Sequence, residues 1–236
     1  MEQDLTTGSV FKRIVYFSLP YLLSYFLQTL YGMADLFITG QFYGVDTITA
    51  VSNGSQIMHM MTVIIVGLAM GTTVTIGHSV GAKCMEQAEK IIGNTITLFM
   101  GIAVAFTVIL VALVKPIVVL IATPQEAVAG TSIYLLICFI GIPFITAYNI
   151  ISSIFRGLGD SKSPMYFIGI ACVMNIALDY LFMGAFHMGA AGAALGTVCA
   201  QTFSVLVALW VIRRRKTGIS LKKSDFKIER AVIGQV

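Results

Sequence analysis

The chain has 236 residues, of which 57% are hydrophobic and 11% are charged, and its mean hydropathy is +0.89. Soluble globular proteins carry about 25% charged residues, so this composition excludes an ordinary soluble domain. The formal net charge of +4 is small, and its distribution along the chain carries more information than its size. We therefore expect an integral membrane protein with an all-α, polytopic fold.

Six apolar runs recur along the chain. A helix rises about 1.5 Å per residue, so roughly 20 apolar residues cross the hydrocarbon core of a bilayer. We expect six transmembrane helices that form one bundle over residues 1–212, followed by a basic segment at 213–236. The expected spans are 14–40, 49–79, 94–114, 130–152, 165–186 and 190–212.

The first expected span contains two informative residues, Pro20 and Asp35. An ionisable side chain within hydrocarbon costs at least a few kcal/mol, so Asp35 is a candidate functional residue. Proline removes a backbone hydrogen bond and favours a kink, and Pro143 does the same in the fourth expected span. A kink at Pro20 is a candidate hinge for the segment that carries Asp35.

Two features of the second span and the connection after it have alternative interpretations. Met58, His59, Met60 and Met61 resemble a soft-metal cluster, but consecutive helical residues point in different directions, which favours ordinary packing. The segment 80–94 mixes charged and apolar residues at helical spacing and predicts a short helix on the membrane surface. The four cysteines are widely separated and predict packing, not redox chemistry.

Polar residues in the later spans lie at a depth that matches Asp35. Asp179 lies within the fifth span, and Asn175 precedes it by four residues, so both side chains share one helix face. Thr197 in the sixth span and Tyr134 in the fourth lie at a similar depth from the same end. Gly192 and Gly196, four residues apart, predict close helix packing.

Two carboxylates enclosed in a dry bundle cannot both stay ionised cheaply, because desolvation and mutual repulsion oppose it. A bound proton or sodium ion would relieve this cost. Asp35, Asp179, Asn175 and Thr197, with a backbone carbonyl, offer the hard oxygen donors that sodium prefers. The alternative is structural: the two aspartates hydrogen-bond neighbouring helices together.

Positive charge predicts the orientation of the bundle, because lysine and arginine are retained on the cytoplasmic side. With both termini cytoplasmic, every lysine and arginine except Lys115 lies on that side. The cluster at 213–223 also permits binding of anionic lipid or nucleic acid. We expect it to be the basic flank of the last span, with no nucleic-acid partner.

Enzymatic alternatives find little support in the sequence. Residues 157–160 read GLGD, which matches the GxGD motif of intramembrane aspartyl proteases. However, Asp160 falls in a charged loop, and Asp179 precedes Tyr180 whereas the second protease aspartate follows a tyrosine. The chain contains neither a P-loop lysine motif nor HExxH. We therefore predict no enzyme, no cofactor and no metal site apart from possible sodium at the aspartate pair.

Several segments together resemble one known family. Pro20 followed by YGMADLFITGQFYG, the VGAK turn, the loop FRGLGDSKSP and the run MNIALDYLFMGAFHMGAAGAALGT are similar to the N-terminal lobe of a multidrug and toxic compound extrusion (MATE) transporter. The match extends across essentially the whole chain. Members of this family have twelve spans in two six-helix lobes, and they expel cationic amphipathic compounds in exchange for sodium ions or protons.

The resemblance implies a role for each candidate residue. Asp35 and Asp179 match the paired acids of the family's N-lobe cation site, and Pro20 matches the proline at which the first helix bends. Asn175, Thr197 and Tyr134 match the supporting polar residues of that site. The resemblance implies the plasma (inner) membrane of a prokaryote, with 213–236 as a cytoplasmic linker towards a second lobe.

The length of the chain leaves two interpretations open. A family member is roughly twice as long, so the chain is either one lobe of a longer protein or a unit of which two copies pair. A related alternative is a flippase for lipid-linked saccharides, which would need basic residues facing an anionic phosphate, and no basic residue lies inside the expected spans. A further alternative is a truncated fragment that does not transport. The sequence does not distinguish sodium from protons and does not define the range of exported compounds.

Overall fold

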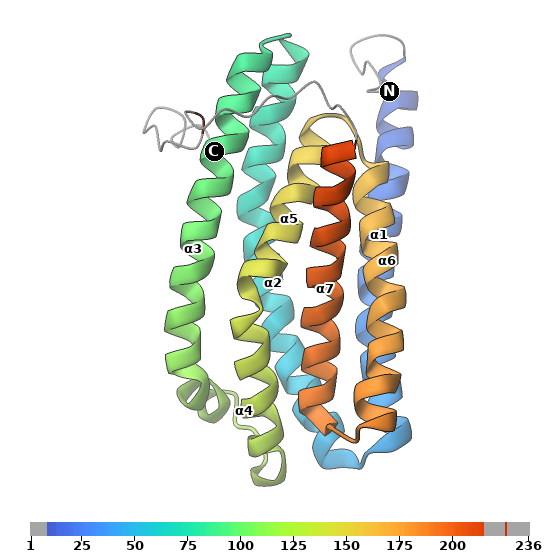
Figure 1. The fold of residues 1–236 in the computed structure, drawn as a ribbon, viewed down its shortest axis with the longest axis vertical. Helices are drawn as coiled ribbons and strands as arrows, with labels where there is room; N and C mark the ends of the chain where they lie inside the picture. The colour runs from blue at the N-terminus through green and yellow to red at the C-terminus, as the bar shows by residue number, and fades with distance from the viewer. Residues whose placement is uncertain (1–8, 215–224, 226–236) are drawn as a thin grey trace.

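The computed structural model describes residues 9–214 and residue 225, and within these residues every regular element is a helix (Figure 1). The predicted all-α class is therefore confirmed. The elements in chain order are α1 (Val10–Phe42), α2 (Val45–Gly81), α3 (Met85–Leu120), α4 (Gln125–Ile140), α5 (Ile142–Gly157), α6 (Lys162–Asp179), the π-helix η1 (Tyr180–Ala185) and α7 (Gly189–Arg214).

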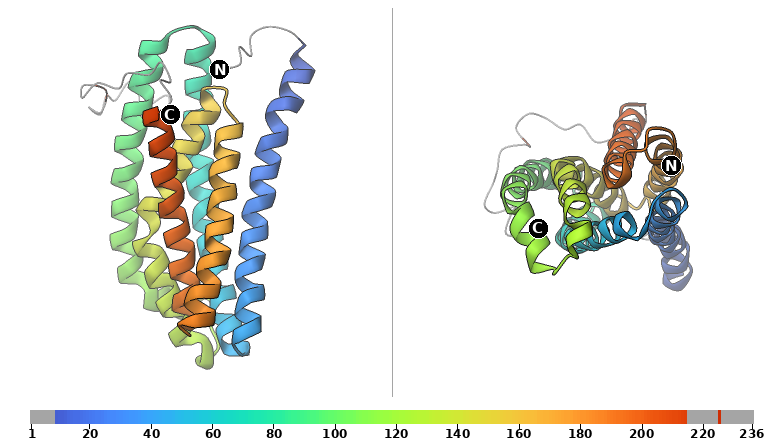
Figure 2. Two further views of the ribbon diagram at one scale, coloured as in Figure 1. Left: turned by 45° about the vertical axis from the view of Figure 1, so that its right-hand side comes forward. Right: turned by 90° about the horizontal axis from the view of Figure 1, so that it is seen from below.

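The helices run up and down along one bundle. The beginning of α1, the α2–α3 turn, the α5–α6 turn and the end of α7 all lie at one end, which we name the termini end; the opposite end is the far end (Figures 1 and 2). Each expected span overlaps one helix, except that the fourth covers α4 and α5 and the fifth covers α6 and η1.

By length and composition, four helices among the described residues are apolar enough to cross a membrane, or five when the bent pair α4 and α5 is counted as one span. α1 is not among them, since Ser, Thr, Gln and Tyr are interspersed along its 33 residues. It nevertheless runs beside α6 through the length of the bundle (Figure 1).

The two helix-interior prolines that the sequence singled out behave differently. α4 and α5 meet at Gly141 with a bend of 51°, and Pro143 lies at the start of α5, where a missing N–H donor is tolerated. α1, in contrast, continues as one helix through Pro20, and the Ser24 hydroxyl donates a 2.8 Å hydrogen bond to the Pro20 carbonyl. The kink predicted in the fourth span is present, whereas the hinge at Pro20 stays a prediction.

The surface helix predicted for 80–94 is wrong. α2 ends at Gly81, a turn with Lys83 in the left-handed region (φ 60°) follows, and α3 then runs unbroken from Met85 to Leu120. Ile91 and Ile92 in the first turns of α3 are buried in a cluster with Ile76 of α2. This packing holds the segment upright against α2, so it does not lie along the membrane.

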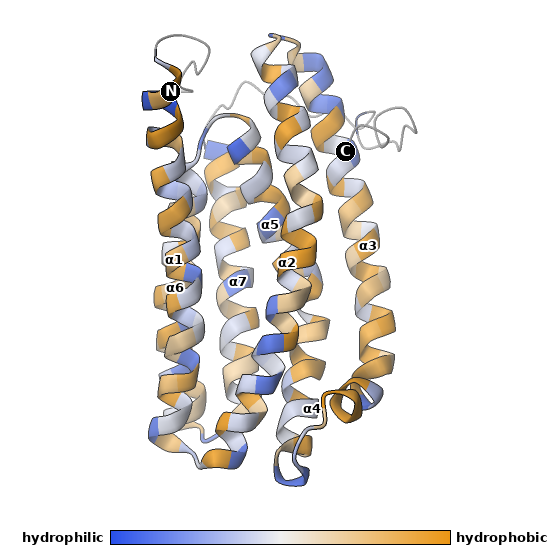
Figure 3. Ribbon diagram, turned by 180° about the vertical axis from the view of Figure 1, so that it is seen from behind, coloured by the Kyte–Doolittle hydropathy of each residue, from blue (hydrophilic) through white to orange (hydrophobic). Residues whose placement is uncertain are grey.

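The helices pack in a simple order. α6 lies between α1 and α7, α2 packs against α4 and α5, and α3 covers α4 and α5 (Figure 2). Large apolar side chains remain exposed on the outer surface, including Phe11 (75% exposed) and Leu120 (84%). Figure 3 shows apolar positions over most helix surfaces, with hydrophilic positions at the ends and along α2. Such a surface is stable when lipid covers it.

The basic segment predicted at 213–236 lies almost entirely outside the described residues. Arg213 and Arg214 are the last residues of α7. Asp225 is buried, and its backbone carbonyl accepts a hydrogen bond of 3.2 Å from the side-chain amide of Asn94 on α3.

A close contact between α2 and α4 gives a test of the packing. A Cβ at Gly54 would overlap the buried ring of Tyr134. We expect Gly54→Ala to destabilise the protein by about 1–3 kcal/mol, because the added methyl group overlaps the ring and forces it or the helix to shift. Gly67→Ala is the matched control on the same helix, since no atom lies within 4 Å of its added Cβ. Unfolding in mixed micelles measures both, and equal stability of the two variants would contradict this packing.

Candidate cation site

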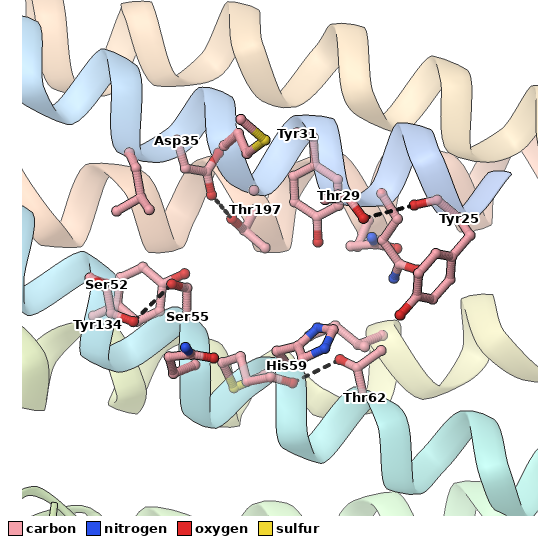
Figure 4. A pocket seen from close by; sticks show the side chains of 18 of the residues that line it. Tyr25, Thr29, Tyr31, Asp35, Ser52, Ser55, His59, Thr62, Tyr134 and Thr197 are labelled. Atoms are coloured by element: carbon pink, nitrogen blue, oxygen red, sulfur yellow. Dashed lines mark hydrogen bonds between the residues drawn. The ribbon is translucent and has the colours of Figure 1, made fainter. Parts of the chain in front are cut away.

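A polar cavity of about 410 Å³ opens among α1, α2, α4, α5 and α7 (Figure 4). Among the described residues that line it, Asp35 is the only carboxylate, and none is lysine or arginine. Three tyrosines and nine neutral polar side chains form most of the rest of the wall. They are Tyr25, Tyr31, Tyr134, Gln28, Thr29, Ser52, Ser55, Gln56, Thr62, Asn149, Thr197 and Gln201.

Asp35 is the point where the cavity meets the second aspartate. Its carboxylate accepts a hydrogen bond of 3.3 Å from the Thr197 hydroxyl (Figure 4). Asp179 and Asn175 also lie against this carboxylate. Neither of them lines the cavity, so they stand behind Asp35 as seen from it. The structure thus brings together four residues from α1, α6 and α7 that the sequence proposed as ligands.

All four side chains are withdrawn from the surface. Asp35 is 3% exposed, Asp179 is fully buried, and Asn175 and Thr197 are 1% and 9% exposed. Within the described part of the chain, no hydrogen bond of good geometry reaches either oxygen of Asp179, Oδ1 of Asp35 or the amide of Asn175. Buried oxygens without donors destabilise a fold unless a cation or proton binds them. The cluster is therefore chemically suited to a small cation.

The position of Asp179 depends on two local features. A Cβ at Gly196 of α7 would overlap the Asp179 carboxylate and would lie 3.6 Å from the Asn175 amide nitrogen. The sequence interpreted Gly196 only as a helix-packing residue, yet its missing side chain leaves the space that Asp179 occupies. Asp179 is also the last residue of α6 before the π-helix η1, an irregularity that recurs at functional sites.

The two remaining predicted residues are Tyr134 and Pro20. Tyr134 is buried in the cavity wall with its ring against Gly54, and among the described residues it donates no hydrogen bond of good geometry to Asp179 or to Oδ1 of Asp35. Pro20 lies outside the cavity lining, about four helical turns before Asp35. Their proposed roles, support of the site and a hinge, stay predictions.

The sequence missed two residues of the cavity wall. Tyr31 precedes Asp35 by four residues, and Gln201 follows Thr197 by four residues, so each shares a helix face with a predicted ligand. Their side chains interact with each other, and Gln201 is only 4% exposed. The i, i+4 spacing from a predicted ligand could have indicated both residues, but many residues with that spacing line no site.

The side chains of the possible soft-metal motif at 58–61 do not converge on one point. Met58 and His59 line the cavity, whereas Met60 is 51% exposed and does not. Among the described residues, no group of three His, Cys, Asp or Glu side chains could hold a metal ion.

The GxGD aspartate has a structural contact. The Asp160 carboxylate accepts hydrogen bonds from the backbone N–H groups of Lys162 and Ser163 at 3.0 Å each, and so caps α6. Asp160 and Asp179 therefore lie at opposite ends of an 18-residue helix, about 27 Å apart. This distance excludes a shared protease site.

Comparison with known proteins identifies similar chains. A sequence model of the MatE family matches residues 20–181. The probable multidrug resistance protein YpnP of Bacillus subtilis is 33% identical over 98% of this chain, which covers 52% of YpnP. A solved MOP superfamily transporter from Pyrococcus furiosus, described as having a binding pocket of reverse polarity that suggests a different function, aligns with a TM-score of 0.89.

That structure is 26% identical to this chain, and the alignment covers 98% of this chain and 51% of the other. An outward-facing multidrug resistance MATE family transporter aligns with a TM-score of 0.87 at 26% identity, over 97% of this chain and 51% of the other. The chain thus spans about half the length of the relatives it matches.

Contact between the two aspartates is testable by a double-mutant cycle. We expect Asp35→Asn and Asp179→Asn to show a coupling free energy of about 0.5–3 kcal/mol, because the two side chains touch. Asp46→Asn provides the control, since Asp46 is exposed in the first turn of α2. It should be additive with Asp35→Asn within about 0.5 kcal/mol. Additivity of the Asp35 and Asp179 changes in the unfolding free energy would show that the residues are apart.

Proposed function

The chain belongs to the MatE family, and we propose that it is one six-helix lobe of a secondary active transporter that exports cationic amphipathic compounds in exchange for sodium ions or protons. The observation that carries this proposal is the buried aspartate pair at the edge of the polar cavity. Asp35 belongs to both the pair and the cavity wall, so an ion at the pair and a compound in the cavity act on the same carboxylate.

The cavity supports a cationic substrate class. One carboxylate and three tyrosine rings face it, and no lysine or arginine does. A delocalised cation gains from the carboxylate and from aromatic faces, whereas an anion would find no lysine or arginine beside it. The apolar remainder of the wall, with Met33, Leu36, Met58 and Ile145, suits the hydrophobic part of an amphipathic compound.

Exchange follows if ion and compound favour different states of the lobe. A cation that enters from outside would load Asp35 and Asp179, and the loaded pair would no longer attract a cationic compound. The compound would then leave outward, and loss of the ion would restore binding from inside. Bending of α1 at Pro20 is the proposed movement that couples the two events.

The distribution of positive charge supports cytoplasmic termini. Lys12, Lys83, Arg156, Lys162 and Arg213 lie at the termini end, whereas Lys115 lies near the far end of α3. The positive-inside rule then directs the termini end to the cytoplasm. The setting we propose is the plasma membrane of a prokaryote.

A flippase for lipid-linked saccharides is the second candidate, and the solved MOP superfamily relative with reverse pocket polarity gives a reason to weigh it. Such a protein would need cationic side chains toward a lipid phosphate. Arg156 lies in the last turn of α5. Its guanidinium stacks on the Tyr21 ring, and it does not line the cavity. The lining therefore favours export of cations.

The partner that completes the transport path is either a second lobe within a longer chain or a second copy of this chain. We propose the second lobe. Sizing of the purified 236-residue chain in detergent tests this: a monomeric particle is expected. A defined dimer would instead favour two paired copies.

The function itself requires a complete transporter with both lobes. We expect Asp35→Asn and Asp179→Asn each to abolish ion-driven efflux of ethidium from everted membrane vesicles, because a neutral amide cannot exchange the coupling ion. Gly196→Ala should reduce efflux in the same way, since its Cβ displaces the Asp179 carboxylate.

Asp46→Asn and Gly101→Ala are the matched controls, and both should retain efflux, because Asp46 is exposed and no atom lies within 4 Å of a Cβ at Gly101. A sodium gradient at fixed pH and a proton gradient without sodium, imposed separately, identify the ion. Unchanged efflux in both aspartate variants would refute the assignment.

A further inference from the structure

A second hollow lies on the outer side of the bundle, between α1 and α6, and we name it the α1–α6 groove. It has a volume of about 520 Å³. Apart from the hydroxyl of Tyr166, its wall carries no polar side chain. The lining residues are Leu23, Leu27, Met165, Tyr166, Gly169, Ile170, Val173, Met174 and Ala177.

The groove and the cation cavity are lined by separate residues of α1. Leu23 and Leu27 are one turn apart and line the groove, whereas Tyr31 and Asp35, the next two residues at four-residue spacing, line the cavity. The two hollows share no residue. Val173 in the groove is 71% exposed and Tyr166 is 60% exposed, so the groove opens to the lipid side of the helices.

Gly169 makes the groove deep. The nearest neighbour to a Cβ at this position is a methyl group of Leu27, at 3.9 Å, so a larger side chain would extend into the hollow. A trough with apolar walls inside a membrane span is filled by hydrocarbon, because water gains no hydrogen bonds there. The natural occupant is therefore an acyl chain.

A cationic group stands at the termini end of the same groove. Lys162 precedes Met165 and Tyr166 by three and four residues on α6, and Tyr16 precedes Leu23 by seven residues on α1, so both lie on the groove side of their helices. The Lys162 ammonium donates a 2.5 Å hydrogen bond to the Tyr16 hydroxyl and lies 4.8 Å from the centre of its ring. The pair bridges α1 and α6 at the end of the groove.

The Lys162 ammonium is directed to a neutral hydroxyl and not to a carboxylate. The nearby Asp160 carboxylate caps α6 through the backbone of Lys162 and Ser163, and its second oxygen accepts the Ser163 hydroxyl at 2.5 Å. Lys162 is exposed and has two further N–H donors. It is therefore able to hold a phosphate at the membrane surface, where anionic headgroups attract basic side chains.

We propose that the α1–α6 groove is a binding site for one anionic phospholipid, with an acyl chain between Leu23, Leu27 and Gly169 and the phosphate on Lys162 and Tyr16. The site belongs to the leaflet at the termini end. It rests on the groove and its cationic end alone, and so stands independently of the proposed transport function. The bound lipid would contact α1 about two to three turns before Asp35.

Native mass spectrometry of the purified 236-residue chain tests the site. The detergent-solubilised protein is titrated with phosphatidylglycerol and, separately, with phosphatidylcholine of the same acyl chains. We expect one phosphatidylglycerol to bind about fivefold more tightly than phosphatidylcholine, because attraction between one surface lysine and an anionic headgroup contributes about this factor to the affinity. Lys162→Gln should remove this preference. Lys115→Gln, a lysine outside the groove near the far end, should retain it.

The groove itself is tested by filling it. Gly169→Leu should weaken binding of both lipids. If that variant fails to fold, Val173→Phe, which fills the groove from its exposed side, should have the same effect. Equal binding of the two lipids by the unaltered chain would overturn the role of Lys162. Binding that neither groove variant changes, or that Lys115→Gln changes as much as Lys162→Gln, would overturn the site. Displacement of the lipid by ethidium would identify the groove as a drug site instead.

Discussion

Two carboxylates in contact inside an apolar bundle are the constraint on which the arrangement of α1, α6 and α7 depends. Asp35 and Asp179 come from helices 144 positions apart in the chain, and both are almost completely buried. Their proximity requires Gly196 on α7, because any side chain there would take the place of the Asp179 carboxylate. Two negative charges this close together are costly unless a cation or proton binds them, since no basic side chain among the described residues lies beside the pair.

α1 joins the features of the lobe because it lines both hollows. Asp35 and Tyr31 line the polar cavity, whereas Leu23 and Leu27, in the preceding turns, line the α1–α6 groove. The polar residues that line the cavity also help to explain why α1 is not among the helices apolar enough to cross a membrane by length and composition, although it runs beside α6 through the bundle. A change at the aspartate pair and a change in lipid contact would therefore both act on the same helix.

Periodicity and depth predicted much of the site. The spacing of Asn175 and Asp179 placed both on one face of α6, and the depth of Thr197 matched that of Asp35, since a membrane helix advances regularly per residue. Other features depended on contacts that no local pattern reveals. The segment at 80–94 reads as amphipathic, yet Ile91 and Ile92 pack against Ile76 and make it the beginning of α3. Tyr31 and Gln201 entered the cavity wall only through the pairing of α1 with α7.

The sequence by itself determined the class of the protein and the helical segments, and it predicted the candidate cation ligands, because an ionisable residue within hydrocarbon is costly and therefore stands out. Only the tertiary structure decided which of these residues meet and which face a cavity or lipid. Asp35 and Tyr134 line the cavity, and Asp179 does not. The physical reason is that helix rotation and approach are set by side chains of distant segments, such as Gly196 against Asp179 and Gly54 against Tyr134.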